Sequence, residues 1–341
     1  MIDATPLVPI APLTLGENNV WPYRVDGRGW LLVDAGLAYT TDDGATSWDA
    51  IVAQARAIGC EPSEVRAVIV THEHIDHAGL AARWAQEGAA IIAMPEALPA
   101  LAAGGAFTDA LRARRLEELR RHGCPRDVLD VLGAQQRPFL LEWPGCPQDA
   151  FVPAQDGDTF ALDGGRMLHV LAAPGHTPGN LVAFVAEREG ATTGELCSGD
   201  TLLPTTIPTP GLHFPGIVEG DTDAPRWPSL PPFLRSVQRL SSLGVRRILP
   251  GHGAIVDDPR RLLAQFTDHH ARRAARILDA LEATPGVTAY EVTRALFPRL
   301  PAARIGQAMT EVIGHLDVLV ERADALQQAD TDGVMRTQLV R

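Results

Sequence analysis

Three histidines and one aspartate lie within six residues of one another, directly after a predicted buried strand. The strand covers residues 65–70 and is bulky and β-branched, and it runs into His72, His74, Asp76 and His77. In an extended turn His72 and His74 point to the same side, and the two later residues fall where the next helix begins, so all four can converge. A polar strand-to-helix loop with a simple N-cap would not need three histidines. The spacing therefore predicts a metal site.

Three further candidate residues follow later predicted strands, each beside glycine or proline. A glycine-flanked histidine in a turn is more often a hydrogen-bonded surface residue, so each one is weak support by itself. In an α/β sheet, however, ligands collect at the carboxyl ends of successive strands, and small neighbours leave room for metal and substrate. These residues are His176 in Gly175-His176-Thr177, Asp200 in Gly199-Asp200-Thr201 and His252 in Gly251-His252-Gly253.

The elements that position these residues alternate between strand and helix, which predicts an α/β core. After a hairpin over residues 20–34, strands are expected over residues 65–71, 89–94, 159–162, 167–172, 181–186, 195–199 and 247–249. Helices are expected over residues 48–58, 76–88 and 232–243, and a long arginine-rich helix begins near residue 259.

Two segments interrupt this alternation. Residues 95–147 form a helical, charged insertion, and residues 204–232 contain eight prolines without a helical or strand period. Both segments leave the sheet at the same end as the metal-binding residues. We therefore expect them to flank the metals as a lid and a stiff apolar loop that narrow the entrance. The alternatives are surface decoration, or a homodimer interface formed through the leucines at 111, 116 and 119.

A separate pattern closes the chain: a helix over residues 290–296, a helix over residues 303–322 and then a hairpin. This order of elements is that of a winged-helix module. We therefore predict a catalytic domain of residues 1–266 and a winged-helix-like domain of residues 267–341. Nine arginines against ten acidic residues give the second domain a net charge of −1. Because a nucleic-acid-binding winged helix normally carries a basic face, a packing or dimerisation role is favoured.

Composition limits the function further. The 341 residues carry 42 acidic and 30 basic side chains, a net charge of −12, and every base is arginine. Without lysine, Schiff-base and lysine-nucleophile chemistry are excluded. An acidic chain is repelled by nucleic acid unless its bases cluster, so a small-molecule substrate is favoured. The four cysteines have no paired spacing, which predicts a reducing, cytoplasmic setting, and no apolar run approaches the ~20 residues of a membrane span.

Taken together, these motifs resemble the metallo-β-lactamase superfamily of binuclear metallohydrolases over roughly residues 20–256. The resemblance implies an αβ/βα sandwich with two divalent metal ions at one edge. The implied first-metal ligands are His72, His74 and His176, the second-metal ligands are Asp76, His77 and His252, and the bridging ligand is Asp200. Asp34 matches the early Asp-Gly motif of the family and is expected to brace a ligand rather than to be one.

The expected chemistry is hydrolysis by a metal-activated water. Two divalent ions about 3.5–4 Å apart lower the pKa of a shared water towards 7 and act as Lewis acids on the electrophilic oxygen. Imidazole and carboxylate suit zinc, and equally iron or manganese, since no thiolate is present to force zinc. Asp76 is the candidate catalytic residue, because it would lie beside the bridging hydroxide and could orient it or carry its proton. His213 and Asn180 are candidates for protonating the leaving group.

Departures from known branches of the superfamily narrow the reaction. Common zinc β-lactamases place a cysteine on the second metal, where this chain has Asp200, so penicillin hydrolysis is disfavoured. Flavodiiron proteins carry glutamate in place of His74. Glyoxalase II usually has histidine where this chain has Asn180, and it binds glutathione partly through lysine. The β-CASP nucleases need an inserted domain for which the residues after His252 leave no room.

The C-terminal pattern resembles the module of the beta-lactamase-like protein 2 branch, which includes an endoribonuclease. Our lead prediction is a binuclear metal-dependent hydrolase that uses a bridging hydroxide on a small carboxylic ester, lactone or thioester. Metal-dependent endoribonuclease activity is the alternative. A mononuclear iron persulfide dioxygenase and a non-catalytic interaction role are the remaining hypotheses.

Overall fold

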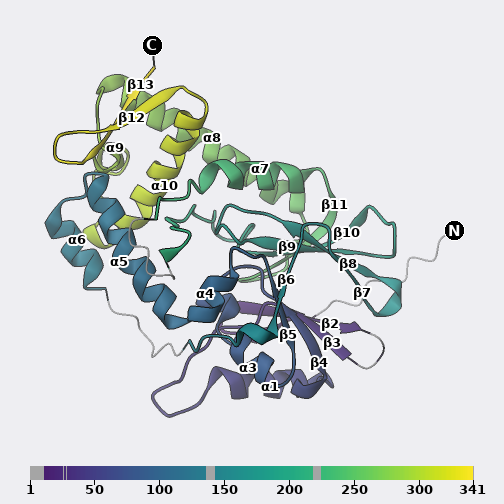
Figure 1. Cartoon of the computed structure of the whole chain (residues 1–341). Helices are drawn as coiled ribbons and strands as arrows, with labels where there is room; N and C mark the ends of the chain where they lie inside the picture. The colour runs from purple at the N-terminus through teal and green to yellow at the C-terminus, as the bar shows by residue number, and fades with distance from the viewer. Residues whose placement is uncertain (1–10, 26, 28, 136–142, 218–223, 341) are drawn as a thin grey trace.

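The computed structural model describes residues 11–25, 27, 29–135, 143–217 and 224–340. Two β-sheets pack face to face, and helices cover both outer faces (Figure 1). This arrangement is the expected αβ/βα sandwich, followed by a small C-terminal domain, so the predicted fold class is confirmed. None of the helices in the described part of the chain combines the length and apolar character needed to cross a membrane.

The first sheet has six strands in the order β1-β2-β3-β4-β5-β6. The pairs β1–β2 and β2–β3 are antiparallel, whereas β3 to β6 run parallel to one another. The strands are β1 (Leu13–Leu15), β2 (Asn18–Val25), β3 (Gly29–Val33), β4 (Val65–Ile69), β5 (Ala90–Ala93) and β6 (Phe151–Pro153).

The second sheet has five strands in the order β11-β10-β9-β8-β7. Neighbours from β7 to β10 are antiparallel, and β11 lies parallel to β10. The carboxyl ends of β8, β10 and β11 therefore lie at the same edge of the sheet. The strands are β7 (Thr159–Ala161), β8 (Met167–Ala172), β9 (Leu181–Ala186), β10 (Thr193–Gly199) and β11 (Gly244–Pro250).

Alternation of side chains along the strands separates the layers of the core. In β4, Val68 packs outward on helices α1 (Ser47–Ala57) and α3 (Ala81–Gln86), while Ile69 faces the core between the sheets. In β9, Phe184 packs outward on helices α7 (Leu230–Ser241) and α8 (Pro259–Ala283), while Leu181 faces inward. Both sheets are therefore apolar on two faces, as their continuous apolar runs require.

The predicted single helix over residues 76–88 is wrong, because the chain forms α2 (Ile75–Ala78) and then α3. A Cβ on Gly79 would lie 2.4 Å from the Ile75 carbonyl and 2.5 Å from the Ala38 backbone nitrogen. The segment after β3 approaches the chain at this point, and the Leu80 backbone N–H donates to the Gly36 carbonyl across 3.1 Å. This tertiary contact separates the two helices.

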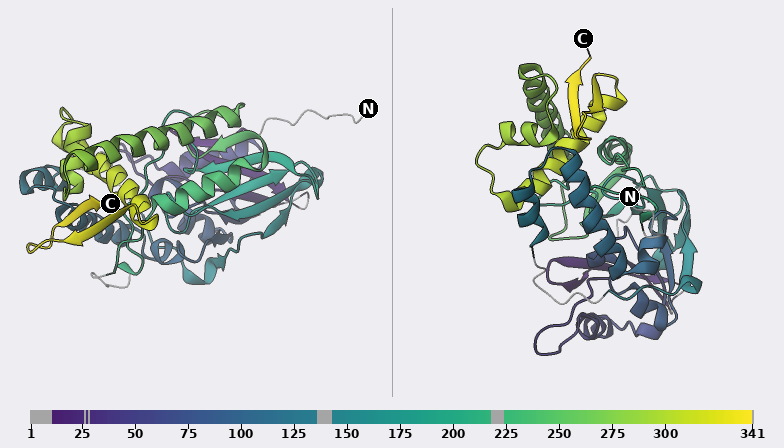
Figure 2. Two further views of the ribbon diagram at one scale, coloured as in Figure 1. Left: turned by 90° about the horizontal axis from the view of Figure 1, so that it is seen from above. Right: turned by 60° about the vertical axis from the view of Figure 1, so that its left-hand side comes forward.

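The insertion folds into three helices, α4 (Leu98–Ala103), α5 (Gly105–Arg121) and α6 (Arg126–Gly133). Helices α5 and α6 lie against the C-terminal domain, and they stay side by side with it in different views (Figures 1 and 2). Leu111 and Leu119 are buried in one apolar cluster with Ile305 and Met309 of that domain. The same chain therefore covers these two leucines, and they do not form a dimer surface.

The C-terminal domain contains helices α9 (Ala289–Leu296) and α10 (Ala302–Glu321) and the hairpin of β12 (Ala325–Ala329) and β13 (Met335–Leu339). This is the expected order of elements, although its assignment as a winged helix stays a prediction. Helix α8 continues without a break through residue 266, so the boundary predicted there falls within a helix. The remaining short 3-10 turns are Pro62–Glu64, Gln148–Ala150 and Asp163–Gly165.

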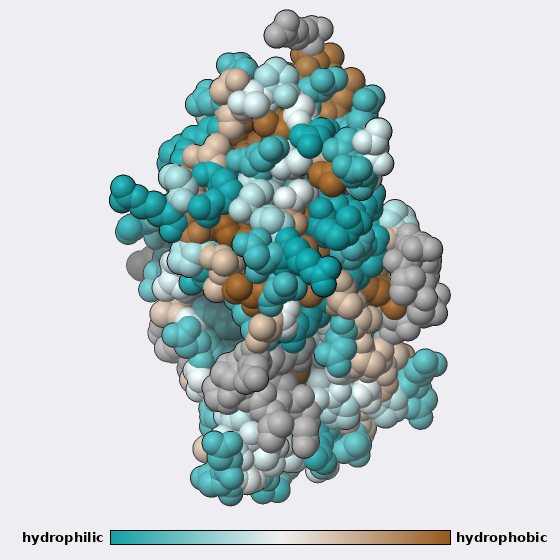
Figure 3. Space-filling model, turned by 90° about the vertical axis from the view of Figure 1, so that its left-hand side faces the viewer, coloured by the Kyte–Doolittle hydropathy of each residue, from teal (hydrophilic) through white to brown (hydrophobic). Residues whose placement is uncertain are grey.

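The face formed by α5, α6 and the C-terminal domain is mixed in character. Apolar residues occur there in small groups between hydrophilic ones (Figure 3). Val131 of α6 and Leu326 of β12 are among the large apolar side chains that remain exposed in the described part of the chain. The homodimer suggested by the sequence stays an expectation.

Candidate metal centre

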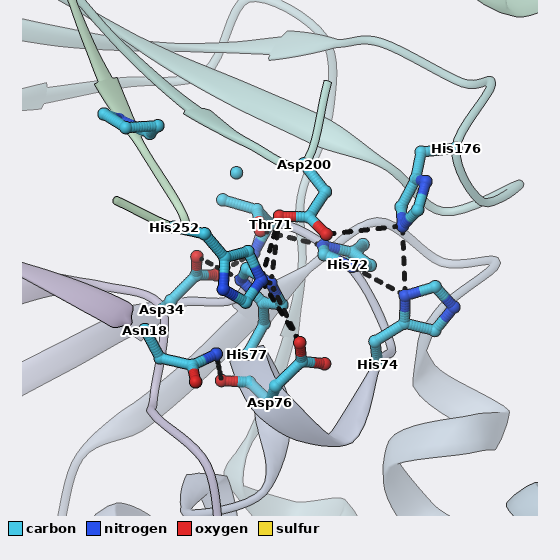
Figure 4. A network of polar contacts seen from close by, with 12 residues as sticks. Asn18, Asp34, Thr71, His72, His74, Asp76, His77, His176, Asp200 and His252 are labelled. Carbon is cyan, nitrogen blue, oxygen red and sulfur yellow. Dashed lines mark hydrogen bonds and ion pairs between the residues drawn. The ribbon is translucent and has the colours of Figure 1, made fainter. Parts of the chain in front are cut away.

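The seven residues predicted as metal ligands all meet at one edge of the sandwich (Figure 4). His72 and His74 follow β4, and Asp76 and His77 belong to α2. The loops after β8, β10 and β11 bring the other three residues to the same edge. These are His176, Asp200 and His252.

The first group of donors contains three histidine nitrogens. Nε2 of His72 lies 3.0 Å from Nδ1 of His74, which in turn lies 3.1 Å from Nε2 of His176. Burial, above all, lowers the pKa of all three side chains, for His74 to about 3. Their rings are therefore held neutral, which is the state in which imidazole coordinates a metal.

The second group combines two histidines with two carboxylates. Nε2 of His252 lies 3.2 Å from Oδ2 of Asp76 and 3.3 Å from Oδ1 of Asp200. Nε2 of His77 lies 3.2 Å from Nε2 of His252 and 3.2 Å from Oδ1 of Asp200. Four donor atoms from four residues thus surround one point. Imidazole and carboxylate ligands in this number suit zinc, iron or manganese.

Asp200 connects the two groups. Its Oδ1 faces the second group, while its Oδ2 lies 3.6 Å from Nε2 of His176 in the first. The carboxylate is therefore placed so that each oxygen serves one group, which is the arrangement that the resemblance implied for a bridging ligand. Figure 4 shows Asp200 between His252 and His176.

The second group fits a divalent cation on its own chemistry. Oδ1 of Asp200 is enclosed, and no described residue donates a hydrogen bond to it. Burial opposes charge on His252, but its close contacts with the carboxylates of Asp200 and Asp76 prevail and raise its pKa to about 9. The carboxylates thus favour positive charge at this point. A divalent cation would supply that charge and satisfy the enclosed oxygen.

Asp34 braces this group rather than joining it. Its Oδ2 lies 2.8 Å from Nδ1 of His77, and its Oδ1 accepts a hydrogen bond of 2.8 Å from the Thr71 backbone N–H. A proton on Nδ1 of His77 leaves the lone pair of Nε2 directed at the metal position. Asp34 has a φ of 69°, in the left-handed region, which aspartate adopts more readily than most residues other than glycine.

Residues of β2 that the sequence did not single out hold the ligand loops in place. The side-chain amide of Asn18 donates to the Asp76 carbonyl across 3.2 Å, and that of Asn19 donates to the Gly253 carbonyl across 2.8 Å. The Trp21 indole donates to the Pro250 carbonyl across 3.1 Å. These contacts join residues 58 to 234 positions apart, so no local spacing could reveal them.

Glycine is required beside His252. A Cβ on Gly251 would lie 2.4 Å from Cε1 of His77 and 3.0 Å from Oδ1 of Asp200. Any side chain at this position would therefore push on the second group of donors. Gly251 therefore leaves the space that the donor side chains themselves occupy, whereas the sequence predicted room for metal and substrate.

The two candidates for leaving-group protonation each form hydrogen bonds that hold a loop of the site. Nε2 of His213 lies 2.8 Å from the His176 carbonyl and braces that loop. The side-chain amide of Asn180 donates to the Ala173 carbonyl and to Thr201, across 3.0 and 2.8 Å. The ring of His213 stacks on that of the predicted ligand His74, with the centroids 6.3 Å apart. Both side chains thus hold loops of the site through these hydrogen bonds.

A small, mainly apolar cavity of about 160 Å³ adjoins the metal-binding residues. The insertion supplies Phe107 and Leu111 to its wall, and the proline-rich segment supplies Phe214 and Ile217. A larger cavity of about 500 Å³ shares Glu96 and two prolines with it and includes Trp227. Both predicted flanking segments therefore contribute walls near the site.

Glu73 is a buried acid that no motif in the sequence singled out. It lies between two predicted ligands, lines the smaller cavity and accepts a hydrogen bond of 2.7 Å from the Thr177 hydroxyl. Burial raises the pKa of its carboxyl to about 7. The sequence did contain one signal for this residue, its position between His72 and His74. In an extended segment, a residue between two ligands points to the opposite side from them.

A buried ion network fixes the segments that wall the site. Arg226 of the proline-rich segment forms a bidentate pair with Asp317 of α10, at 2.6 and 2.5 Å. Its Nε lies 3.2 Å from Oε1 of Glu118 of α5. All three side chains are nearly enclosed. One guanidinium thus joins the insertion, the proline-rich segment and the C-terminal domain.

Comparison with known proteins agrees with this geometry. Residues 13–252 match the family described as "Metallo-beta-lactamase superfamily", and residues 274–339 match "Metallo-beta-lactamase-like, C-terminal domain". The chain belongs to the metallo-beta-lactamase superfamily. The second match names the C-terminal module by its family and leaves its winged-helix character as a prediction.

Several curated relatives are similar to the chain. The probable metallo-hydrolase YqjP of Bacillus subtilis (strain 168) is 28% identical over 308 residues, which cover 90% of each chain. A beta-lactamase-like protein 2 homolog of Caenorhabditis elegans is 26% identical, and an atrochrysone carboxyl ACP thioesterase of Aspergillus fumigatus is 28% identical. These two matches cover 46% and 43% of this chain and span less than half of each relative.

Solved structures share the fold over nearly the whole chain. A metallo-beta-lactamase family protein from Thermus thermophilus has a TM-score of 0.69 at 25% identity and covers 96% of this chain and 97% of its own. A beta-lactamase domain protein from Burkholderia ambifaria has a TM-score of 0.70 at 24% identity, with 97% and 91% coverage. With the family and the clustered donors, these findings define a metal-dependent hydrolase.

Proposed function

We propose that this protein is a binuclear metal-dependent hydrolase of small carboxylic esters, lactones or thioesters, with zinc as its native metal. The observation that carries the proposal is the pair of donor groups that share Asp200, one oxygen to each group. Three neutral histidines suit one ion, and the mixed group of histidine and carboxylate suits a second.

The chain's own residues have distinct tasks in this reaction. When bound, the two ions supply Lewis acidity and lower the pKa of water towards 7. Asp34 fixes the orientation of His77, and His213 fixes the loop of His176, so the donors do not have to reorganise. Asp76 has a side chain that is 32% exposed, and its Oδ1 has no partner among the described residues. That oxygen can orient the attacking water and accept its proton.

A small substrate is favoured by the surroundings of the site. The adjoining cavity of about 160 Å³ has mainly apolar walls, which suit an acyl chain better than a polyanion. The net charge of −12 opposes binding of nucleic acid. A relative with the thioesterase name in Aspergillus fumigatus agrees with the thioester as one substrate type.

Metal analysis combined with one activity plate tests the proposal. Fully active protein should contain about two equivalents of metal. Chromogenic esters, lactones and acyl-CoA thioesters should be hydrolysed, while a fluorescent single-stranded RNA in the same plate should stay intact. Cleavage of RNA alone, with a rate that falls steeply as salt rises, would favour the endoribonuclease. One equivalent of iron and oxygen uptake with glutathione persulfide would favour the dioxygenase.

A further inference from the structure

A positively charged side chain, that of Arg115, lies close to the predicted metal ligands. Nε of Arg115, on α5, donates a hydrogen bond of 3.0 Å to the Leu212 carbonyl. The next residue is His213, whose ring stacks on His74 with the centroids 6.3 Å apart. The guanidinium of the insertion is thus bonded to the backbone of the residue that precedes His213, and the ring of His213 packs on a predicted metal ligand.

The two terminal nitrogens of this guanidinium have no partner. Among the residues that the structure describes, none accepts a hydrogen bond or forms an ion pair with Nη1 or Nη2 of Arg115. Neither nitrogen is among the fully enclosed polar atoms that lack a partner, so both keep some contact with solvent, although the side chain is only partly exposed. By contrast, Arg112 on the same helix donates to the Gly133 and Gln135 carbonyls, and Arg120 pairs with Glu117.

Arg115 is partly buried, and its charge lies close to the buried carboxyl of Glu73 and to the ring of His213. A partly buried cation with free N–H groups is costly to keep, and an anionic ligand would offset that cost.

Helix α5 aligns this cation with the apolar cavity. Phe107 and Leu111 line the cavity, and Arg115 follows at the same spacing of four residues. Residues four apart lie on the same face of a helix, so the guanidinium continues the face that borders the cavity. A substituent that lies in the cavity would meet apolar walls along its length and a cation at its end.

We propose that Arg115 binds a carboxylate on the acyl part of the substrate. The natural substrates would then be monoesters or monothioesters of dicarboxylic acids. Because Nε is held by the Leu212 carbonyl, Nη1 and Nη2 present two parallel N–H groups that match the two oxygens of a carboxylate. This inference rests on the proposed hydrolase function and names the substrate class within it.

The test compares charged and uncharged substrates of the same shape. The 4-nitrophenyl monoesters of succinate, glutarate, adipate and suberate are assayed beside the corresponding monoamides, which are isosteric and neutral. Wild type should prefer the best carboxylate by about 10- to 100-fold in kcat/KM, the effect expected of charged hydrogen bonds. Arg115→Met should abolish this preference by raising KM for the carboxylate, with kinetics on the monoamide within about threefold of wild type.

Two further variants control the result. Arg115→Lys keeps the positive charge but lacks the two parallel N–H groups, so it should retain part of the preference for the carboxylate. Arg112→Met, on the same helix, should leave this preference unchanged. Equal kcat/KM for both substrate series in wild type would overturn the proposal. So would an Arg115→Met enzyme that loses both activities by the same factor, because Arg115 would then only support residue 212. If that variant fails to fold, wild type and Arg115→Lys decide.

A binding measurement separates this proposal from the proposed function. Calorimetry of the metal-loaded protein with glutarate and with its monoamide should show tighter binding of the dicarboxylate, lost in Arg115→Met. If no ester is hydrolysed but this difference is found, the ester hydrolase is wrong and the carboxylate site stands. If esters are hydrolysed but the difference is absent, the hydrolase stands and the role of Arg115 is wrong.

Discussion

The two sides of the candidate active site are built in different ways. On the metal side, every donor stands in a short segment that follows a strand, and backbone hydrogen bonds and glycine contacts fix these segments. On the opposite side, α5, the proline-rich segment and α10 are distant in sequence and are joined by apolar contacts and one buried ion network. Loss of a donor on the first side should therefore remove activity without unfolding the protein, and loss of the contacts that join the second side should mainly lower its stability.

The largest expected effect is loss of a metal ligand. His72→Ala, Asp200→Ala and His252→Ala should each abolish hydrolysis, because each removes a donor that no neighbouring side chain replaces. Activity and metal content are measured together, and Asp200→Ala should lower the content from about two equivalents. His169→Ala, a change on β8 outside both donor groups, should behave as wild type. An active Asp200→Ala enzyme with two bound ions would contradict the bridging role.

Breaking the ion network should mainly affect stability. Arg226→Met leaves the carboxylates of Glu118 and Asp317 buried without their shared cation, which costs about 3–5 kcal/mol in the free energy of unfolding. Denaturant titration measures this loss. Arg235→Met is the matched control, because its pair with Glu321 is exposed and should contribute less than about 1 kcal/mol. Similar losses of unfolding free energy in the two variants would mean that the ion network does not fix the segments that line the cavity.

Asp34→Asn is expected to have an intermediate effect on the metal side. The amide oxygen can still accept from the Thr71 backbone N–H, but the charge that orients His77 is lost. Affinity for the second metal should fall about 10- to 100-fold, as is usual when a carboxylate behind a histidine ligand is removed. Competition with a chelator measures this affinity. An unchanged affinity would show that His77 needs no brace.

The smallest expected effect is a pH dependence of stability that arises from Glu118 in the ion network. Burial opposes ionisation of Glu118, but the hydrogen bond from His122 and the charge of Arg226 outweigh it and lower its pKa to about 2. Its stabilising effect is therefore complete above the unfolded pKa of about 4.3 and is lost as the pH falls towards 2. The difference in unfolding free energy between wild type and Glu118→Gln should shrink over this range. A difference independent of pH would contradict this assignment.

The same contrast explains what the sequence could predict. The histidine motif and the strand-end loops are local signals, and the structure brings all seven predicted ligands together. Strand β8 and strand β9 have the predicted bounds, because alternation and bulky apolar residues mark them clearly. The site of chemistry could thus be found from residues that stand close together in the chain.

The remaining features depend on contacts between distant segments. The break between α2 and α3 comes from the approach of residue 38, which no helical pattern contains. The leucines at 111 and 119 are typical of an apolar helix face, but the pattern does not say whether the same chain or a second copy covers it. Arg115 and Arg226 look like any other arginines in the sequence. Only the fold distinguishes the one with open N–H groups from the one that is paired.

The pairing of α5 with α10 also has a consequence for how the chain folds during synthesis. Leu111 cannot be fully covered until Ile305 has left the ribosome, about 190 residues later, which takes roughly 10–40 s at usual rates of translation. For that interval the apolar face of the insertion lacks its partner α10 and can contact only α6 and the proline-rich segment. The last part of this interval falls after β11, so part of this face is expected to stay uncovered for a time after both sheets are complete.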